Sequence, residues 1–465
     1  MIDIAVFAGY LAALLVIGRQ TSGRIRSAED FHLCGRSLTR LPAALSLAAT
    51  EFSGSGLIGG AGLAYAIGIS GAYWNLTAVP AWILVGCTVA VTLRRTTLDT
   101  IPGYMGERYG VASRRLAALL QMIEAVVFIA VQIMVSAISL STLFAMDVTT
   151  ASILVTSAFV AYTAMGGLWA VVWTDVLQYV ILMSGVLIGL PLALMKVGGI
   201  AHVSAALPDS YFDPGRLGIM EPLAWMALCV YSYATDQTYM QRVFASRDAQ
   251  VARFAYLFTG VNYLVFGACV AGMGLIAAAV LPGLPHQDQA LPRLISDILP
   301  QGLRGFFLTA ILATTMSTAS AWLAAGSSLA IQDWYEPIRQ RALEERHLLR
   351  ASRLATIVLA ALALVVALRF PGVVNAVVFS TLVAPAAIFA PLIFGLYWKR
   401  TTATAGFVSL VSAALTGVAS HVLWYRTASG WLGAIHPLFL GPAVGVIVIV
   451  VISILQSGFS RSVRC

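Results

Sequence analysis

Charged residues are scarce in this sequence of 465 residues. Asp, Glu, Lys and Arg make up only 10% of it, against about 25% in an average soluble domain, whereas apolar residues make up 59%. The mean hydropathy is +0.87. This shortage of charge excludes a soluble globular protein. It indicates a protein that crosses a membrane many times, because about 13 helices of about 22 residues would occupy roughly 60% of the chain.

Closely spaced cysteines are also lacking. No two of the five form a Cys-x-x-Cys pair, so the sequence signals neither a structural metal site nor a disulfide framework. They are Cys34, Cys87, Cys229, Cys269 and Cys465. We expect buried or incidental thiols.

Histidines are few, and none falls in the middle of an apolar run. All six lie in expected loops or at the ends of expected spans, so no His–acid cluster or activated nucleophile can be assembled at membrane depth. They are His32, His202, His286, His347, His421 and His436. The distribution argues against a membrane-embedded enzyme, and we expect no catalytic residues.

The first apolar run, residues 2–18, is expected to be a retained helix. A cleaved signal peptide would have Lys or Arg before its apolar run and a small-residue cleavage site after it, whereas this run contains Asp3 and is followed by Arg19 and Gln20. Twelve further spans are expected along the chain. The complete set is 2–18, 41–65, 73–93, 116–145, 149–165, 168–195, 219–241, 254–281, 303–330, 354–370, 373–397, 402–424 and 436–456.

The basic residues are distributed by membrane side. With 13 spans and the N-terminus outside, 22 of the 28 Lys and Arg residues fall in cytoplasmic segments, as the positive-inside rule predicts. The formal net charge of +8 therefore reflects topology, and we expect no contact with nucleic acid. The prediction is a multi-pass protein of the plasma (inner) membrane with a cytoplasmic C-terminus.

Spans two to six and seven to eleven can be laid over each other as two five-helix halves. Each half has an odd number of spans, so the halves would have opposite orientation and form inverted repeats. The first helix of each half carries a polar interruption, at residues 51–54 and 231–237. The expected organisation is an N-terminal extra helix and cytoplasmic loop (1–40), a first half (41–200), a second half (201–400), and two C-terminal helices with a short tail (401–465).

Glu51 is the most informative single residue. It lies beside a glycine-rich run, residues 54–62, inside an apolar segment that is long enough to cross a bilayer. An acid at membrane depth is costly unless it is paired, hydrated or neutralised by a cation. Glycines weaken the helix where backbone carbonyls could be freed to bind such a cation. The segment therefore indicates ion-coupled transport.

The ninth span supplies hydroxyl groups. Thr314, Ser317 and Thr318 share one helical face at 100° per residue. Because Na⁺ is a hard cation that takes oxygen ligands, these hydroxyls and the carbonyls of a broken partner helix would make a weak sodium site. The alternative is that Ser and Thr are only small packing residues between membrane helices.

Three further acids fall in expected spans, each with two interpretations. Asp175 could bind an ion, or it could reach the inner surface, because it lies two turns into its span. Glu124 could serve transport or only hydrogen-bond a neighbouring helix. For Asp236, a salt bridge near the inner mouth, close to Arg242, is as well supported as a contact with the solute.

At these residues the chain resembles the sodium:solute symporter family, whose members carry proline, sugars, sialic acid, pantothenate and similar solutes. The resemblance covers nearly the whole chain and rests on four short motifs in a fixed order. They are Gly166-Gly167-Leu168 followed by residues 173–178, Thr235-Asp236-Gln237 followed by Gln241-Arg242, Met316-Ser317-Thr318, and residues 391–395 followed by Trp398-Lys399-Arg400-Thr401. The family implies an all-α, leucine-transporter-type fold with a five-plus-five inverted-repeat core, one extra helix before it and two after it.

By this resemblance the coupling ion is Na⁺, and its main site corresponds to five residues of this chain. They are Ala49, Phe52 and Thr314 through their carbonyls, and Ser317 and Thr318 through their hydroxyls.

Members with a second sodium site build it from an acid that corresponds to Asp175 and from two hydroxyls. Those positions hold Ser320 and Ala321 here, so one ligand is missing and we expect a single coupling ion. Glu51 stands where the proline carriers have an aspartate that supports sodium binding.

The solute is limited by one more absence, since no Lys or Arg falls in the middle of an expected span. A strongly anionic solute would lack its obvious partner. The candidate solute-binding residues are Ser53, Ser55, Tyr73, Trp74, Asn75, Gln132, Tyr233, Gln237 and Phe379. Their character favours a zwitterion such as an amino acid, or a cation over an aromatic face. Each aromatic could instead be core packing or an interfacial anchor.

The expected function is sodium-coupled symport of a small polar organic solute by alternating access, for which a monomer in the lipid bilayer suffices. Two alternatives remain open. One is a proton-coupled symporter on the same fold, with Glu51 as the proton carrier. The other is a transporter-like solute sensor that needs a partner protein.

Overall fold

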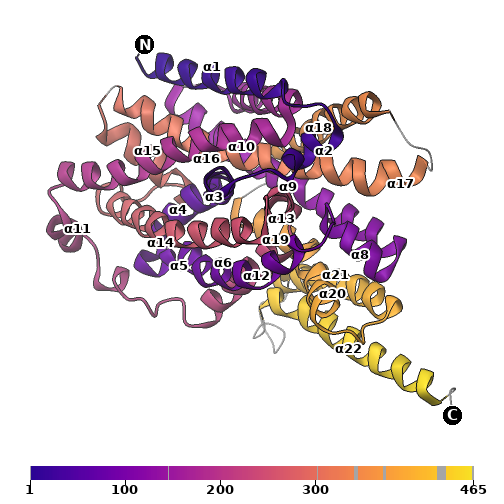
Figure 1. Cartoon of the computed structure of the whole chain (residues 1–465). Coiled ribbons are helices and arrows are strands. Elements are labelled where there is room, and N and C mark those ends of the chain that lie inside the picture. The colour runs from indigo at the N-terminus through magenta and orange to yellow at the C-terminus, as the bar shows by residue number, and fades with distance from the viewer. Residues whose placement is uncertain are drawn as a thin grey trace.

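The computed structural model describes residues 2–144, 146–300, 302–339, 344–369, 373–426 and 436–462. Within these ranges the chain is helical and has no named strand, apart from an isolated bridge between Leu38 and Ser246. Figure 1 shows the helices gathered around α9, α13 and α16, with the C-terminal helices α20 to α22 at one edge.

The longer helices and their continuations occupy the expected spans. They are α1 (Ile2–Ser22); α3 (Arg40–Glu51), η2 (Ser55–Gly59) and α4 (Gly60–Ile67); α5 (Tyr73–Leu76), α6 (Ala78–Cys87) and α7 (Val89–Arg94); α9 (Val111–Phe144); α10 (Val148–Lys196); α12 (Met220–Thr235) and α13 (Gln237–Ala245); α14 (Ala249–Val280); α16 (Leu303–Ser328) and η6 (Leu329–Tyr335); α18 (Glu345–Ala367); α19 (Val373–Val383) and α20 (Pro385–Tyr397); α21 (Ala403–Arg426); and α22 (Pro437–Ser462).

Short helices connect these long ones. They are α2 (Ala28–Leu33), η1 (Cys34–Arg36), η3 (Gly68–Ala72), α8 (Ile101–Tyr109), α11 (Ile200–Ala206), η4 (Asp209–Tyr211), η5 (Gln287–Gln289), α15 (Ala290–Ile298) and α17 (Glu336–Arg339).

The expected spans are helical along most of their described length, although residues 145 and 370, at the ends of two of them, lie outside the described residues. Among the described residues, nine helices are long and apolar enough to cross a membrane, and the α19–α20 pair, bent by 41°, would be a tenth. The multi-pass architecture is therefore confirmed, while the number of 13 spans stays a prediction.

Helix α10 differs from the expectation of two separate spans. It runs for 49 residues, about 74 Å if straight, which is more than twice the thickness of a hydrocarbon core. Gly167 interrupts it with φ 51° and ψ −143°. A Cβ at this position would lie 2.4 Å from the carbonyl oxygen of Phe31, so a glycine is required on both counts. Two membrane-length segments meet there without a loop between them.

Helix α16 lies at the centre of the molecule. Its side chains are buried along almost the whole helix, and it contacts α1, α9, α10 and α18. Its many Ala, Ser and Thr residues allow the neighbouring helices to approach closely. This helix positions the hydroxyl groups of the site described next.

Candidate sodium and solute site

The second expected span is broken between α3 and η2. The backbone N–H of Ser53 donates to the carbonyl only two residues before it (2.6 Å), and that of Gly54 donates to Gln132 Oε1 (3.0 Å). In a continuous helix these N–H groups would donate to the carbonyls of Ala49 and Thr50. The break therefore releases both carbonyls from the helix.

Close packing holds the chain in this broken form. A Cβ at Gly54 would lie 2.8 Å from Thr315 Cγ2 and 2.9 Å from Gln132 Oε1, so no larger residue fits without a shift. Thr315 in turn accepts a hydrogen bond from Ser136 Oγ of α9 (2.6 Å). The break is thus clamped between α9 and α16.

The released carbonyls face the hydroxyls of α16. Ser317 Oγ donates to the carbonyl of Ala49 (2.7 Å), and Thr318 Oγ1 donates to that of Thr50 (2.8 Å). Both hydroxyls also lie within 3.1 Å of the carbonyl oxygen of Thr314, and all five residues are buried. A hydroxyl that donates to a carbonyl can rotate and turn its lone pairs to a cation instead. The structure thus brings four of the five expected sodium ligands together.

Phe52, the fifth expected ligand, lies at the break itself. Phe52 caps the C-terminal end of α3 with φ −68° and ψ 63°, outside the helical region. Its ring stacks on that of Phe266, with centroids 4.6 Å apart and planes within 3°.

The carbonyl of Thr50 takes part in the cluster and was not expected. The helical-face argument pointed to the hydroxyls, but the residue that each one meets depends on the packing of α3 against α16.

Asp175 does not reach the inner surface, so that interpretation is wrong. It is fully buried, and its Oδ2 accepts hydrogen bonds from Ser46 Oγ (2.6 Å) and from Arg242 Nη2 (3.0 Å). Arg242 is buried as well, and its Nε donates to Ser46 Oγ (2.9 Å). Ser320, expected beside Asp175, donates to the carbonyl of Ser317 (3.0 Å).

The alternatives considered for the other two acids are also wrong. Asp236 has no salt bridge with Arg242, because Arg242 pairs with Asp175 instead. Glu124 does not hydrogen-bond a neighbouring helix, since neither of its carboxylate oxygens has a partner within the described part of the chain.

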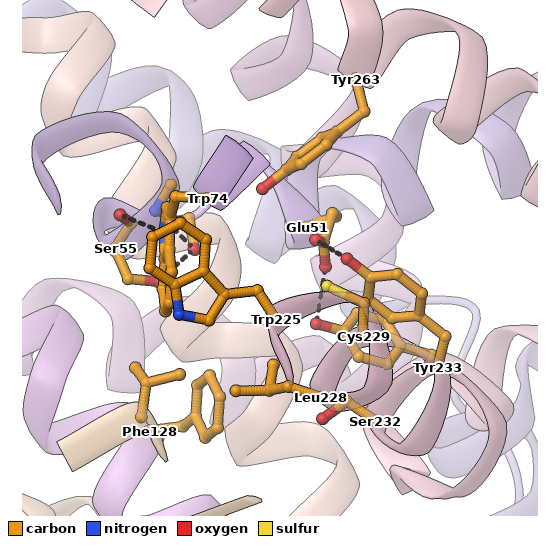
Figure 2. Close-up of a pocket in the computed structure, with 14 residues that line it drawn as sticks. Glu51, Ser55, Trp74, Phe128, Trp225, Leu228, Cys229, Ser232, Tyr233 and Tyr263 are labelled. Atoms are coloured by element: carbon orange, nitrogen blue, oxygen red, sulfur yellow. Dashed lines mark hydrogen bonds between the residues drawn. The ribbon is translucent and has the colours of Figure 1, made fainter. Parts of the chain in front are cut away.

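Glu51 is buried and receives two tyrosine hydroxyls. Tyr239 donates to Oε2 (2.7 Å), and Tyr233 donates to Oε1. Hydrogen bonds from hydroxyls to a carboxylate are among the strong ones in proteins. Figure 2 shows Glu51 and Tyr233 side by side on one wall of a cavity.

This cavity is narrow, and the centres of water-sized molecules can occupy about 50 Å³ of it. Two indoles, of Trp74 and Trp225, meet edge to face in its wall with centroids 5.4 Å apart. Within the part of the chain that the structure describes, no basic residue lines it. Its lining residues are Glu51, Ser53, Ser55, Gly56, Trp74, Phe128, Trp225, Leu228, Cys229, Ser232, Tyr233, Tyr239, Tyr263 and Val377.

Four of the expected solute-binding residues, Ser53, Ser55, Trp74 and Tyr233, line this cavity. Asn75 and Gln132 lie just outside it and hold the broken backbone. Asn75 Nδ2 donates to the carbonyl of Gly56 (3.0 Å), as Gln132 accepts from Gly54.

The other three expected residues lie away from the cavity. Tyr73 lines a second, more open depression with the 214–226 segment. The side-chain amide of Gln237 forms hydrogen bonds at the start of α8. Its Oε1 accepts from the backbone N–H of Ile101 (3.0 Å), and its Nε2 donates to the carbonyl of Asp99 (3.1 Å). The ring of Phe379 packs against that of His421, with centroids 5.6 Å apart.

Several lining residues were missed by the sequence analysis. Trp225, Leu228, Cys229 and Ser232 recur at intervals of three, one and three residues, which places them on one face of α12. This helical spacing could have identified the four residues from the sequence as one face of α12. For Phe128, Tyr239 and Tyr263, only the packing of the helices shows that they face the same space.

Comparisons with known proteins identify the family of the chain. The model of the sodium:solute symporter family matches residues 31–412. The high-affinity proline transporter of Bacillus subtilis (strain 168) is 27% identical over 481 residues, covering 97% of each chain. The sodium/glucose cotransporter of Vibrio parahaemolyticus is 27% identical over 463 residues, covering 89% of this chain and 83% of its own.

A solved structure shows the fold. The structure of a Na⁺-coupled sialic acid symporter, in a substrate-bound outward-open state, superposes with a TM-score of 0.87 at 21% identity, covering 98% of both chains. The fold is therefore of the leucine-transporter type, as the sequence motifs implied.

Proposed function

Because the chain belongs to the sodium:solute symporter family, we propose that it imports a small zwitterionic or cationic organic solute together with Na⁺ by alternating access. The observation that carries the proposal is the cavity with Glu51 in its wall. This carboxylate lies among aromatic side chains, and none of the described residues that line the same space is basic. Such a cavity complements a positive group and offers nothing to balance a net negative charge.

The chemistry of the lining favours an ammonium or quaternary amine. The faces of Trp74, Trp225 and Tyr233 can attract a cation through their π-systems. Ser53 and Ser55, whose hydroxyls are 2.8 Å apart, offer hydrogen bonds to a polar or carboxyl group at the other end of the solute. A zwitterionic amino acid would use both kinds of contact.

The cluster of α3 carbonyls and α16 hydroxyls supports Na⁺ as the coupling ion. Its atoms are neutral oxygens, the ligand type that a hard monovalent cation accepts. It also adjoins Glu51, since Thr50 contributes a carbonyl to the cluster and precedes Glu51 in the chain. An ion that orders this break would also order the wall of the cavity, which gives a physical route for coupling.

The proposed orientation has the N-terminus outside and the C-terminus in the cytoplasm, supported by the distribution of basic residues. We propose the inverted-repeat halves 41–200 and 201–400 as the moving parts. The two broken helices, α3–η2 and α12–α13, begin these halves.

A flux experiment tests the proposal. The purified protein is reconstituted into vesicles and given labelled amino acids, quaternary amines, sugars and sugar acids, first with a sodium gradient and then with a pH gradient in sodium-free buffer. We expect a sodium gradient to drive uptake of an amino acid or a quaternary amine. Uptake driven fully by the pH gradient would instead establish proton coupling, and preference for an anionic solute would overturn the proposed solute class. Specific binding without flux would indicate a sensor.

A further inference from the structure

Two acids lie behind the wall of the cavity, outside the cluster proposed to bind the coupling ion. Glu124 lies on α9, one turn before Phe128, and Asp236 lies in the break between α12 and α13, one turn after Ser232. Phe128 and Ser232 both line the cavity. The two acids are fully buried, and neither lines the cavity itself.

Gln121 connects the two acids. It lies one turn before Glu124 on the same face of α9, and its Nε2 donates to the carbonyl of Thr235 (2.5 Å), the residue that precedes Asp236. The side chain is only 1% exposed. Its amide therefore ties the Glu124 face of α9 to the break that carries Asp236.

Four oxygen atoms at this place have no hydrogen-bond partner within the described residues. They are both carboxylate oxygens of Glu124, Oδ2 of Asp236 and Oε1 of Gln121. Buried polar atoms are almost always hydrogen-bonded in proteins. The hydroxyl of Ser232, which interacts with Asp236, can satisfy one of these acceptors at most, so the remaining ones require an explanation.

The charge of the two acids is also unbalanced. The carboxylates are close enough to repel each other. Arg242 of α13 and Arg114 of α9 are paired with other acids, Arg242 with Asp175 (3.0 Å) and Arg114 with Asp333 (2.7 Å). Two buried carboxylates without a positive partner are strongly destabilising.

We propose that Glu124, Asp236 and Gln121 form a binding site for an alkali-metal cation. In the proposed site the four oxygens are ligands of one cation, whereas one shared proton gives a single donor and leaves other acceptors unsatisfied. Four oxygens fall short of the six to eight that Ca²⁺ takes, and Mg²⁺ retains waters that a fully buried site does not offer. The described residues also contain no cluster of three or more His, Cys, Asp or Glu side chains that would suit a transition metal.

The site differs in charge from the sodium cluster of α3 and α16. Two carboxylates contribute formal negative charge here, whereas the ligands there are hydroxyls and backbone carbonyls. More ligand charge gives tighter binding of a cation. The site is therefore occupied at lower sodium concentration and keeps its ion through the transport cycle, so that the ion offsets one of the two negative charges beside the cavity and does not couple transport.

Equilibrium binding of radioactive sodium to the purified full-length protein tests this inference. We expect two phases in the wild type, a tighter one and a weaker one. Glu124→Gln and Asp236→Asn should remove the tighter phase and leave the weaker one, while Ser317→Ala should weaken only the second. Glu107→Gln, the same change at an exposed residue of α8, is the matched control and should alter neither.

A tighter phase that survives both Glu124→Gln and Asp236→Asn overturns the proposal, as does binding in a single phase that only Ser317→Ala changes. Because removal of a buried charge can disturb folding, Gln121→Leu provides a second test with both carboxylates in place. It should weaken the tighter phase about fivefold, the loss expected when one neutral oxygen ligand is removed. Competition by Ca²⁺ and not by K⁺ would contradict an alkali-metal site. The sodium cluster of α3 and α16 can fail its own test without affecting this result.

Discussion

Two broken helices of this protein carry an acid at or beside the break, and they differ in what the acid meets. Between α3 and η2, Glu51 receives two tyrosine hydroxyls, and the released carbonyls receive hydroxyls from α16. Between α12 and α13, Asp236 meets the hydroxyls of Ser232 and Thr235 only weakly, at 3.4 Å for Thr235 Oγ1, and its Oδ2 has no partner within hydrogen-bond distance among the described residues. At the α3–η2 break the polar groups form hydrogen bonds with one another. At the α12–α13 break they leave an acceptor without a partner in the described part of the chain.

This difference suggests how each site treats an ion. Where hydroxyls can return to carbonyls, an ion can leave at small cost, which a coupling ion must do in every cycle. Where buried carboxylates have no positive partner among the described residues, loss of the ion would leave uncompensated charge. The contrast therefore supports a transported ion at the first break and a permanently bound ion beside the second.

The largest effect is expected at the acid of the first break. Glu51→Gln should lower the initial rate of sodium-driven uptake about a hundredfold, because a neutral amide replaces the acceptor of two charge-assisted hydrogen bonds worth about 3 kcal/mol together. Glu51→Asp should retain part of the activity, since the carboxylate survives with a shorter reach. Uptake into vesicles, with Glu107→Gln as the surface control, provides the measurement.

The same variant distinguishes the two coupling ions. A Glu51→Gln protein that keeps solute exchange but loses accumulation driven by a pH gradient would indicate that Glu51 carries a proton, because the amide mimics the protonated acid. Full sodium-driven uptake by this variant would show that the charge of Glu51 is not needed.

A smaller effect is expected at the hydroxyls of α16. Ser317→Ala or Thr318→Ala should raise the sodium concentration for half-maximal uptake about fivefold, because each removes one neutral oxygen worth about 1 kcal/mol. The apparent affinity for solute should fall only at low sodium, through linkage between the two sites.

Ser327→Ala is the matched control for these variants. It removes a buried hydroxyl of the same helix that bonds the carbonyl of Ser352 (2.9 Å), away from the break. Unchanged sodium dependence in both Ser317→Ala and Thr318→Ala would exclude the proposed cluster as the coupling site.

Composition and local pattern were sufficient to predict an all-helical protein with many membrane spans. Low charge and long apolar runs indicated the helices, and the glycines after Glu51 indicated the break in the second span. The face shared by Thr314, Ser317 and Thr318 also followed from helical periodicity alone. These features depend on residues near each other in the sequence, so no knowledge of packing was needed.

The partners of the buried polar groups could not be predicted in the same way. Proximity in the sequence suggested that Arg242 pairs with Asp236, but its partner is Asp175, 67 residues away. Gln237 was expected to face the solute, yet its amide bonds Ile101 and Asp99. Both outcomes depend on how distant helices and loops pack, which residue spacing does not determine.

The smallest effect is expected at Ser320, where members with a second sodium site have a ligand. Arg242 already balances the charge of Asp175 (3.0 Å), the hydroxyl of Ser320 bonds the carbonyl of Ser317 (3.0 Å), and Ala321 offers no oxygen on its side chain. We therefore expect one sodium to move with each solute. Ser320→Ala should change half-maximal sodium by about twofold at most, since a hydrogen bond to a backbone carbonyl contributes about 0.5 kcal/mol.

The Hill coefficient for sodium and the reversal potential in vesicles measure this stoichiometry. Both should indicate one ion, because a cation held permanently by Glu124 and Asp236 would contribute to neither quantity. A Hill coefficient near two, together with a reversal potential for two ions, would contradict the prediction. If Ser320→Ala then restored a coefficient of one, Asp175 and Ser320 would be shown to complete a second site for a transported ion. The comparison of one exchanging ion with one permanently bound ion would then be wrong.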